Sequence, residues 1–208
     1  MRPEFRRVPA LLVAALSGAL LAPAQSTSVR DLGIGKLLVA PRDTLDPNFA
    51  ETVILLVQYD EGGVVGLTIN RRTKLPISRV LKDLKGAKDK SDPLYVGGPV
   101  QMDGLLGLLR SRNKPGDAPP VFADIYLVSA KQLLEKTLVA GTGPNEFRIY
   151  VGYCGWTEGQ LQREVKLGAW YIFPATTDLV FNAEANSVWQ RLIALTEQQI
   201  AQFRPARQ

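Results

Sequence analysis

The clearest alternation of hydrophobic and polar residues lies between positions 147 and 173. Over its first seven residues, large hydrophobic side chains occupy every second position, which predicts a β-strand. After a turn at Gly155, Leu161 and Val165 fall four residues apart, as on one face of a helix. Gly168 suits the left-handed residue that ends a helix. The five residues that close the stretch predict a second strand.

The start of the predicted helix carries a capping signal. Thr157 can accept a hydrogen bond from the helix backbone, and Gln160 stands three residues later, as in a capping box. We therefore expect Thr157 to be the N-cap of this helix. Free backbone N–H groups at a helix start can also hold a carboxylate or phosphate. A cap satisfied by its own side chains is the simpler interpretation.

The rest of the chain predicts a mixed fold. Two hydrophobic runs flank a glycine-containing turn at residues 59–63, which predicts an antiparallel hairpin. Strands and helices do not alternate strictly, so the pattern favours an α+β class. Further strands are expected at residues 36–40, 52–58, 64–70, 94–96, 105–110 and 121–128, and further helices at 76–84, 129–136 and 183–195.

The N-terminus differs from the rest in composition. Three arginines lie within the first seven residues, an apolar run covers residues 8–21, and small residues follow at 22–24. This order is typical of a secretory signal peptide, and the run is short for a membrane span. No cysteine follows the run, so cleavage before Gln25 would leave no stable membrane anchor.

Four segments are expected from this pattern. Residues 1–24 are the signal peptide, 25–34 a loose N-terminal arm, 35–196 a single domain, and 197–208 a C-terminal tail. The mature protein would then be secreted or periplasmic. The alternative is a misassigned start codon, which would leave a cytoplasmic protein.

The balance of charge disfavours nucleic acid as a partner. The chain has 25 basic and 20 acidic side chains, a net charge of +5. Three of the arginines and one glutamate lie in residues 1–24, so 22 basic and 19 acidic side chains remain in the mature chain. They are also scattered along it, whereas nucleic-acid binders gather basic residues on one face.

The choice of reactive residues limits the chemistry. The chain has no histidine, which removes the commonest general base and the commonest metal ligand. Its only cysteine, Cys154, lies between Gly152 and Trp156 at the predicted strand-to-helix turn. A nucleophile at such an elbow is followed two residues later by glycine, and here that place is taken by Trp156. We expect Cys154 to be a small packed residue. The alternative is an enzyme in which a helix N-terminus activates it as a nucleophile.

Three blocks of sequence resemble a known family. They are GYCGWTEGQLQREVKLGAW at 152–170, GKLLVAPRDTLDPNFAETVILLVQYDEGGVVGLTINR at 35–71, and GGPV at 97–100. Through these blocks the chain resembles the YqgE/AlgH family, whose members are often labelled transcriptional regulators and have no established biochemical activity. The resemblance implies a bifurcated sheet containing a small barrel-like part, surrounded by helices.

A ligand-binding groove is the favoured hypothesis for function. Glycine, polar and aromatic residues stand at predicted strand ends or helix starts, where they can face a common surface. We expect a non-enzymatic binding or regulatory protein whose partner is an unknown protein or small ligand, with no cofactor and no metal site. The predicted groove residues are Asn70, Gly97, Gly98, Trp156 and Gln160. Structural roles are the alternative, with the tryptophan in the core and the glycines at a tight strand exit.

Overall fold

The computed structural model describes residues 28–182 and 184–203. The predicted signal peptide lies outside these residues. The strands are β1 Lys36–Val39, β2 Val53–Asp60, β3 Gly63–Thr68, β4 Arg72–Pro76, β5 Pro93–Val96, β6 Val100–Arg110, β7 Pro120–Phe122, β8 Ile125–Val128, β9 Phe147–Trp156 and β10 Tyr171–Pro174. The α-helices are α1 Ile77–Val80, α2 Lys131–Val139, α3 Gln160–Lys166 and α4 Ala185–Phe203. A 3₁₀ turn, η1 Val29–Asp31, precedes β1, and a π-helical turn, η2 Asp178–Asn182, precedes α4.

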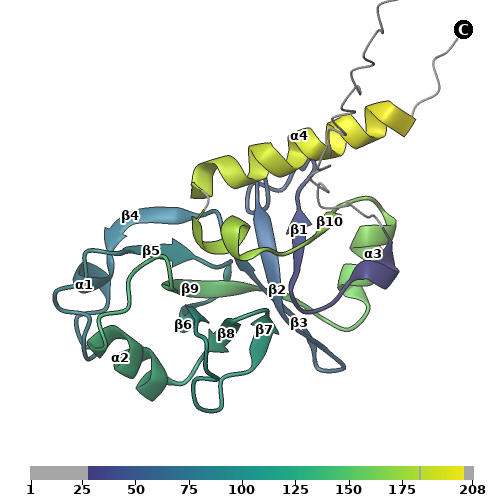
Figure 1. Cartoon of the computed structure of the whole chain (residues 1–208). Coiled ribbons are helices and arrows are strands. Elements are labelled where there is room, and N and C mark those ends of the chain that lie inside the picture. Colours follow the sequence, from purple (N-terminus) through teal and green to yellow (C-terminus); the bar gives the residue numbers. More distant parts are fainter. Residues whose placement is uncertain (1–27, 183, 204–208) are drawn as a thin grey trace, which may run out of the picture.

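One curled, branched sheet holds all the strands, and helices lie around it (Figure 1). The main path runs β10-β1-β2-β3-β9-β6-β8-β7, and the β4–β5 pair branches from it. Every pairing is antiparallel except β5 with β9. The α+β class and the bifurcated sheet that the resemblance implied are therefore confirmed.

Strand β9 is where the sheet branches. Its first half pairs with β5 on one side and β6 on the other, and its last three residues pair with β3. Gly152 lies at the change of partner with φ of +65°, a conformation that glycine adopts at little cost. A Cβ at Gly152 would also collide with the carbonyl oxygen of Gly98. Glycine is therefore required at this point.

Three hydrophobic clusters make up the core, and β9 contributes to all of them. Tyr150 belongs to the largest, which lies under η2 and α4. Cys154 belongs to a second cluster with residues of α3, β1 and β2. Phe147 and Ile149 belong to a third with residues of α1 and α2. Alternate positions of this strand thus face different clusters, which explains why few of its residues are exposed.

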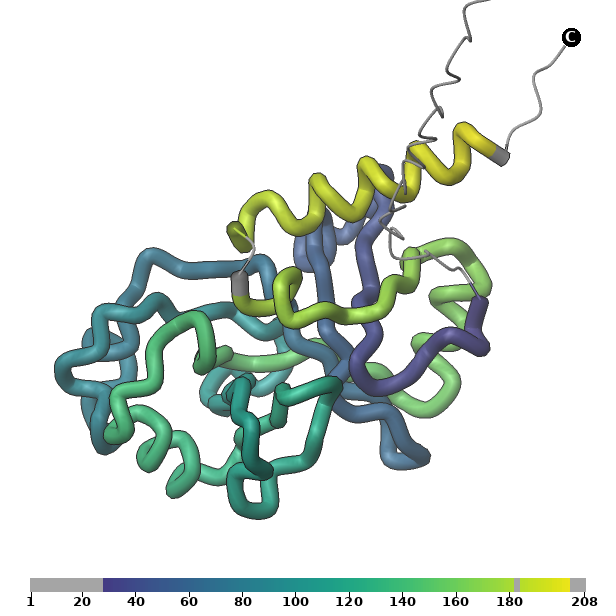
Figure 2. Tube along the Cα trace, viewed as in Figure 1, coloured from purple at the N-terminus to yellow at the C-terminus, as the bar shows by residue number. Residues whose placement is uncertain are grey.

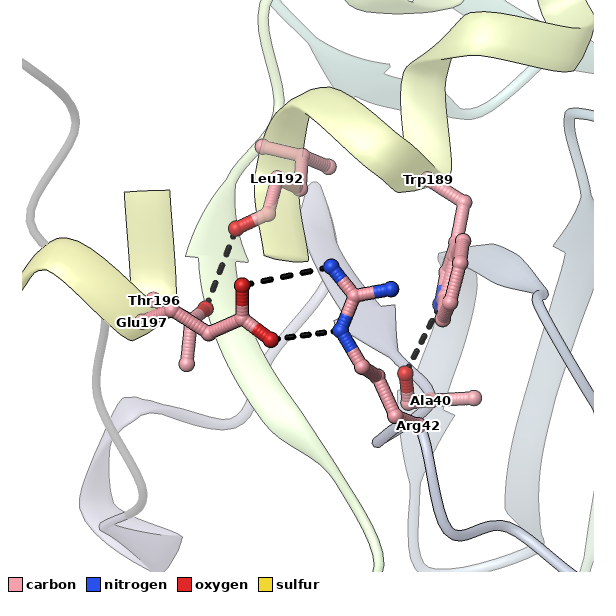
Figure 3. Close-up of polar contacts among 6 residues, drawn as sticks. All are labelled: Ala40, Arg42, Trp189, Leu192, Thr196 and Glu197. Atoms are coloured by element: carbon pink, nitrogen blue, oxygen red, sulfur yellow. Dashed lines mark hydrogen bonds and ion pairs between the residues drawn. The ribbon is translucent and has the colours of Figure 1, made fainter. Parts of the chain in front are cut away.

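Helix α4 lies across the part of the sheet formed by β1, β2 and β10 (Figure 2). Trp189 is buried and donates its indole N–H to the carbonyl oxygen of Ala40 at 2.8 Å. Glu197, which follows the buried Thr196 on α4, forms a two-bond ion pair with Arg42, and the Arg42 guanidinium lies over the Trp189 ring (Figure 3). The hydrogen bonds from Arg42 lower the pKa of the exposed Glu197 carboxyl.

Several element boundaries differ from the expected ones. Helix α4 continues to Phe203, beyond the expected end at 195, so the first part of the predicted tail is helical. The expected helix at 76–84 shortens to α1, because Val80 is exposed and only Ile77 of this helix is buried. The expected strand 121–128 divides into β7 and β8 at Ala123, whose φ is +45°.

Two further features of the structure were not anticipated. Strand β4 was not expected, because Arg72 and Lys74 are polar and exposed on a short strand paired on one side. Part of the expected loose arm is packed, since Val29 and Leu32 contact the second hydrophobic cluster.

Candidate functional site

Cys154, expected to be a packed residue and alternatively a nucleophile, is enclosed by the sheet. Cys154 is 1% exposed and lies on β9 opposite Gly66 of β3. Its sulfur is 3.6 Å from the Thr68 hydroxyl and donates to the carbonyl oxygen of Gly97 at 3.4 Å. Burial raises the pKa of the Cys154 thiol to about 11. This geometry keeps the thiol protonated and away from solvent.

The Gly97–Gly98 turn packs directly on β9. The N–H of Gly97 donates to Val151, and its carbonyl oxygen accepts from the N–H of Thr68, both at 2.8 Å. A Cβ at Gly97 would collide with the carbonyl oxygen of Gly152, and a Cβ at Gly98 would collide with the backbone of Tyr153. Both glycines are buried. They serve the close approach of two backbone segments.

A glutamate in α3 joins the aromatic residues of the signature stretch. The Glu164 oxygen Oε2 accepts the indole N–H of both Trp156 and Trp170 at 2.9 Å. The other carboxylate oxygen, Oε1, accepts from the Gln160 amide at 3.0 Å. Trp156 and Trp170 are 6% and 4% exposed, and their rings meet edge to face at 6.3 Å. We call these four residues the Trp–Glu–Trp lock.

The expected capping box forms only in part. Helix α3 begins at Gln160 after Gly159, whose φ is +70°, and no side chain caps it. The Gln160 amide oxygen accepts the backbone N–H of Thr157 at 3.2 Å, which is one half of the box. The hydroxyl of Thr157 contacts Gln160 and not the helix backbone. The positive φ of Gly159 moves the helix start beyond the expected place.

Asn70 also has a structural partner. Its side-chain oxygen accepts the N–H of Val53, and its amide donates to the carbonyl oxygen of Glu51, both at 2.8 Å. The side chain thus holds the backbone at the start of β2. The sequence had instead predicted that Asn70 lines a ligand groove. Positions at strand ends can serve either purpose, and the sequence does not distinguish them.

The structure brings together some of the predicted groove residues. Gly97 and Gly98 lie against β9 beside Cys154, while Trp156 and Gln160 belong to the lock. The Asn70 side chain bonds to the backbone at the start of β2 and to none of the other four residues. The groove stays a prediction, because the three clefts described below are lined by other residues.

The largest of these clefts, about 710 Å³, lies between the end of β6, the segment after it and α2. Arg110 and Asp124 line it and form an ion pair at 2.9 Å. Arg112 and Lys136 also line it, and neither side chain has a hydrogen bond or ion pair with any described residue. Thr137 on α2 uses its hydroxyl within the helix, donating to Leu133.

Sequence reasoning missed this cleft for a physical reason. Residues 111–120 read as a polar loop, and nothing in a loop's composition says what it faces. Residues of this segment line the cleft together with residues of α2, which lie about 20 positions further along the chain. The only available signal was a pair of basic residues, Arg112 and Lys136, separated by 24 positions.

Two smaller clefts lie nearby. One of about 410 Å³ separates the segment after α1 from β6 and the start of α2. The other, about 150 Å³, is lined by Arg148 and residues of β4 and η2. In residues 28–182 and 184–203 no group of three or more acidic, cysteine or histidine side chains could hold a metal ion. Over the same residues, no helix combines the length and hydrophobicity of a membrane span.

The branched sheet and the lock define the class of protein. A family model described as AlgH-like matches residues 37–201, which is most of the described domain. The chain therefore belongs to the AlgH-like family. The family signature noted in the sequence coincides with strand β9, helix α3 and the lock between them.

Relatives and solved structures agree with this assignment. A UPF0301 protein of Chlorobium phaeobacteroides is 34% identical over 161 residues, covering 76% of this chain and 84% of that protein. The solution structure of the AlgH protein from Pseudomonas aeruginosa is 30% identical with a TM-score of 0.63, covering 84% of this chain and 95% of that one. A Corynebacterium diphtheriae protein at 23% identity, TM-score 0.63, covers 77% of this chain and 85% of its own, and shows the fold alone.

The lock can be tested by removing its acceptor. Glu164→Ala would leave two largely buried indole N–H groups without a partner, so we expect the free energy of unfolding to fall by about 3 kcal/mol. Urea unfolding followed by tryptophan fluorescence measures this. Glu158→Ala is the matched control, because Glu158 is exposed in the turn before α3. Equal losses in the two variants would contradict the structural role of Glu164.

Proposed function

We propose that this member of the AlgH-like family is an exported, non-enzymatic binding protein that holds a small, negatively charged ligand. The cleft between β6 and α2 is the proposed binding site. The observation that carries the proposal is that the side-chain cations of Arg112 and Lys136 line a cleft of about 710 Å³ without a bonded partner among the described residues. That volume lies in the usual range for small-molecule sites.

The charges in the cleft favour an anion of modest size. Arg110 is already neutralised by Asp124, and Glu146 is the other acidic residue in the lining. Arg112 and Lys136 therefore supply the cationic groups that a ligand carboxylate or phosphate could pair with. Leu109 and Leu133 add apolar surface at the same place.

The environment of Cys154 supports binding over catalysis. A nucleophilic cysteine needs its thiolate and access to substrate. Here burial raises the thiol pKa to about 11, and Thr68 and Gly97 surround the sulfur. The chain contains no histidine that could act as a general base.

Export would separate this protein from the chromosome. The pattern in residues 1–24 is that of a signal peptide, and a protein outside the cytoplasm cannot regulate transcription by binding DNA. The charge of the mature chain is also nearly balanced. These features support the proposal that the protein binds its ligand outside the cytoplasm.

Ligand-observed NMR with the intact chain tests the cleft. We expect saturation transfer to succinate and to a sugar phosphate, and little to the matching neutral sugar, because the free cations select for negative charge. The double variant Arg112→Gln with Lys136→Gln should bind the two anions about tenfold more weakly or worse. The control removes two exposed cations elsewhere, Arg79→Gln with Lys166→Gln. Equal binding of the neutral sugar would contradict the proposal.

The state of Cys154 is measured by alkylation with iodoacetamide. At pH 7 a thiol of pKa about 11 is ionised in on the order of one molecule in ten thousand. The folded chain should therefore resist labelling, and urea should expose the thiol to rapid labelling. The free energy of unfolding should fall as the pH rises from 9.0, the ordinary pKa of a thiol, to about 11. Over this range the unfolded chain loses the thiol proton and the folded chain keeps it. Rapid labelling of the folded chain below pH 7 would favour the enzyme alternative.

Export is decided by the mass of the protein isolated from its own cells. We expect a chain that begins at Gln25, because residues 22–24 are small as a signal peptidase requires. Ala24→Arg, which places a large side chain beside the cleavage point, should prevent processing. Finding that the unaltered protein begins at Met1 would remove the export argument.

A further inference from the structure

Arg148 is the only charged side chain among the buried polar residues of the described chain. It stands on β9 and is 7% exposed. Lysine and arginine are seldom buried to this degree unless they are paired with an anion. None of the four ion pairs between described residues includes Arg148. Its positive charge therefore has no carboxylate partner in residues 28–182 and 184–203.

The guanidinium group is held by carbonyl oxygens. Its Nη1 donates to Val180, its Nη2 to Phe181 at 2.6 Å, and its Nε to Pro144 at 3.3 Å. It also lies over the ring of Tyr95 at 5.0 Å. These contacts fix the group rigidly, since the carbonyls come from η2 and from the turn before β9. They use three of the five N–H donors of an arginine.

A cavity of about 150 Å³ opens beside this group. Arg148, Tyr95 and Phe181 line its interior, and Arg72 and Glu184, both exposed, line its rim. Its volume equals the share of about five water molecules, which suits a carboxylate or a phosphate group. Two arginines and one glutamate leave the lining with a net positive charge.

A second polar group lies next to Arg148. Tyr150 stands two residues further along β9 and is fully buried. Its hydroxyl makes no hydrogen bond of ordinary geometry, and the Arg148 side chain lies within its hydrogen-bonding reach. A hydroxyl that accepts from Arg148 still has its own proton to donate. The region around Arg148 thus has donor capacity that the described chain does not use.

We propose that this cavity binds the oxyanion end of a small ligand, a carboxylate or a phosphate group, between Arg148 and Arg72. Arg148 is the fixed, desolvated donor at the base, where a charge-assisted hydrogen bond is strong. Arg72 completes the pairing at the entrance. The site is separate from the cleft between β6 and α2, and it does not depend on the function proposed for that cleft.

NMR titration of the intact, isotope-labelled chain tests the proposal. Sodium phosphate, sulfate and acetate are added at constant ionic strength against sodium chloride. We expect saturable shifts at the amides of Asn145, Arg148 and Phe181 with phosphate or acetate, and the relative affinities distinguish a phosphate ligand from a carboxylate. No saturable shift with any of the three anions would overturn the proposal.

Variants at the rim separate a site from a general salt effect. Arg72→Gln should weaken binding about tenfold or more, and Glu184→Gln should strengthen it by removing a like charge. Lys74→Gln is the matched control, because Lys74 is exposed on the same strand and does not line the cavity. It should leave the affinity unchanged.

Two outcomes of the comparison would reject the site. Phosphate and sulfate stabilise many proteins without binding, so equal shifts in the Arg72→Gln and Lys74→Gln variants would mean a non-specific effect. Unchanged binding in Arg72→Gln would mean that the entrance pairing is wrong. In either case Arg148 would serve only to attach η2 to β9.

Discussion

The close contact between the Gly97–Gly98 turn and β9 is the constraint on which the rest of the structure depends. The two backbones approach so closely that a Cβ on Gly97, Gly98 or Gly152 would collide with main-chain atoms of the other segment. The contact sets the point at which β9 leaves β5 and β6 and joins β3. A larger residue at any of these positions would force the strands apart, and the three hydrophobic clusters that share β9 would separate with them.

The stretch after this contact extends the same constraint to the outer layer. Once β9 has turned at Gly152, Cys154 faces inward and Trp156 reaches over Gly66, where a Cβ would lie 3.2 Å from its ring. Glu164 then connects that tryptophan to Trp170 at the start of β10. Because one carboxylate oxygen serves both indoles, the spacing from β9 through α3 to β10 is fixed by hydrogen-bond geometry. The signature sequence is therefore explained as a structural unit.

The sequence predicted the parts of this fold that depend on local pattern. Runs of apolar residues located the strands around Leu38 and Ile54, and the glycine turn after Asp60 located the hairpin of β2 and β3. The branching of the sheet was implied only by the family resemblance, because strand order is set by contacts between residues distant in sequence. The groove prediction failed to anticipate the bonds of Asn70 and Gln160, since polar residues at strand ends and helix starts look alike whether they bind backbone or ligand.

The location of unused donors follows from the same architecture. The four residues of the lock satisfy one another, and cationic side chains with spare donors lie where β9 begins and where β6 ends. Arg148 is buried there because alternate positions of β9 face different clusters, and an inward position in its first half must be covered by η2. A rigid sheet thereby holds a desolvated cation at a fixed place, whereas Arg112 on the neighbouring segment remains accessible. Binding sites gain from such fixed groups, because less conformational freedom is lost when the ligand arrives. Arg148 thus secures η2 on β9 and is also the fixed cation of the proposed site.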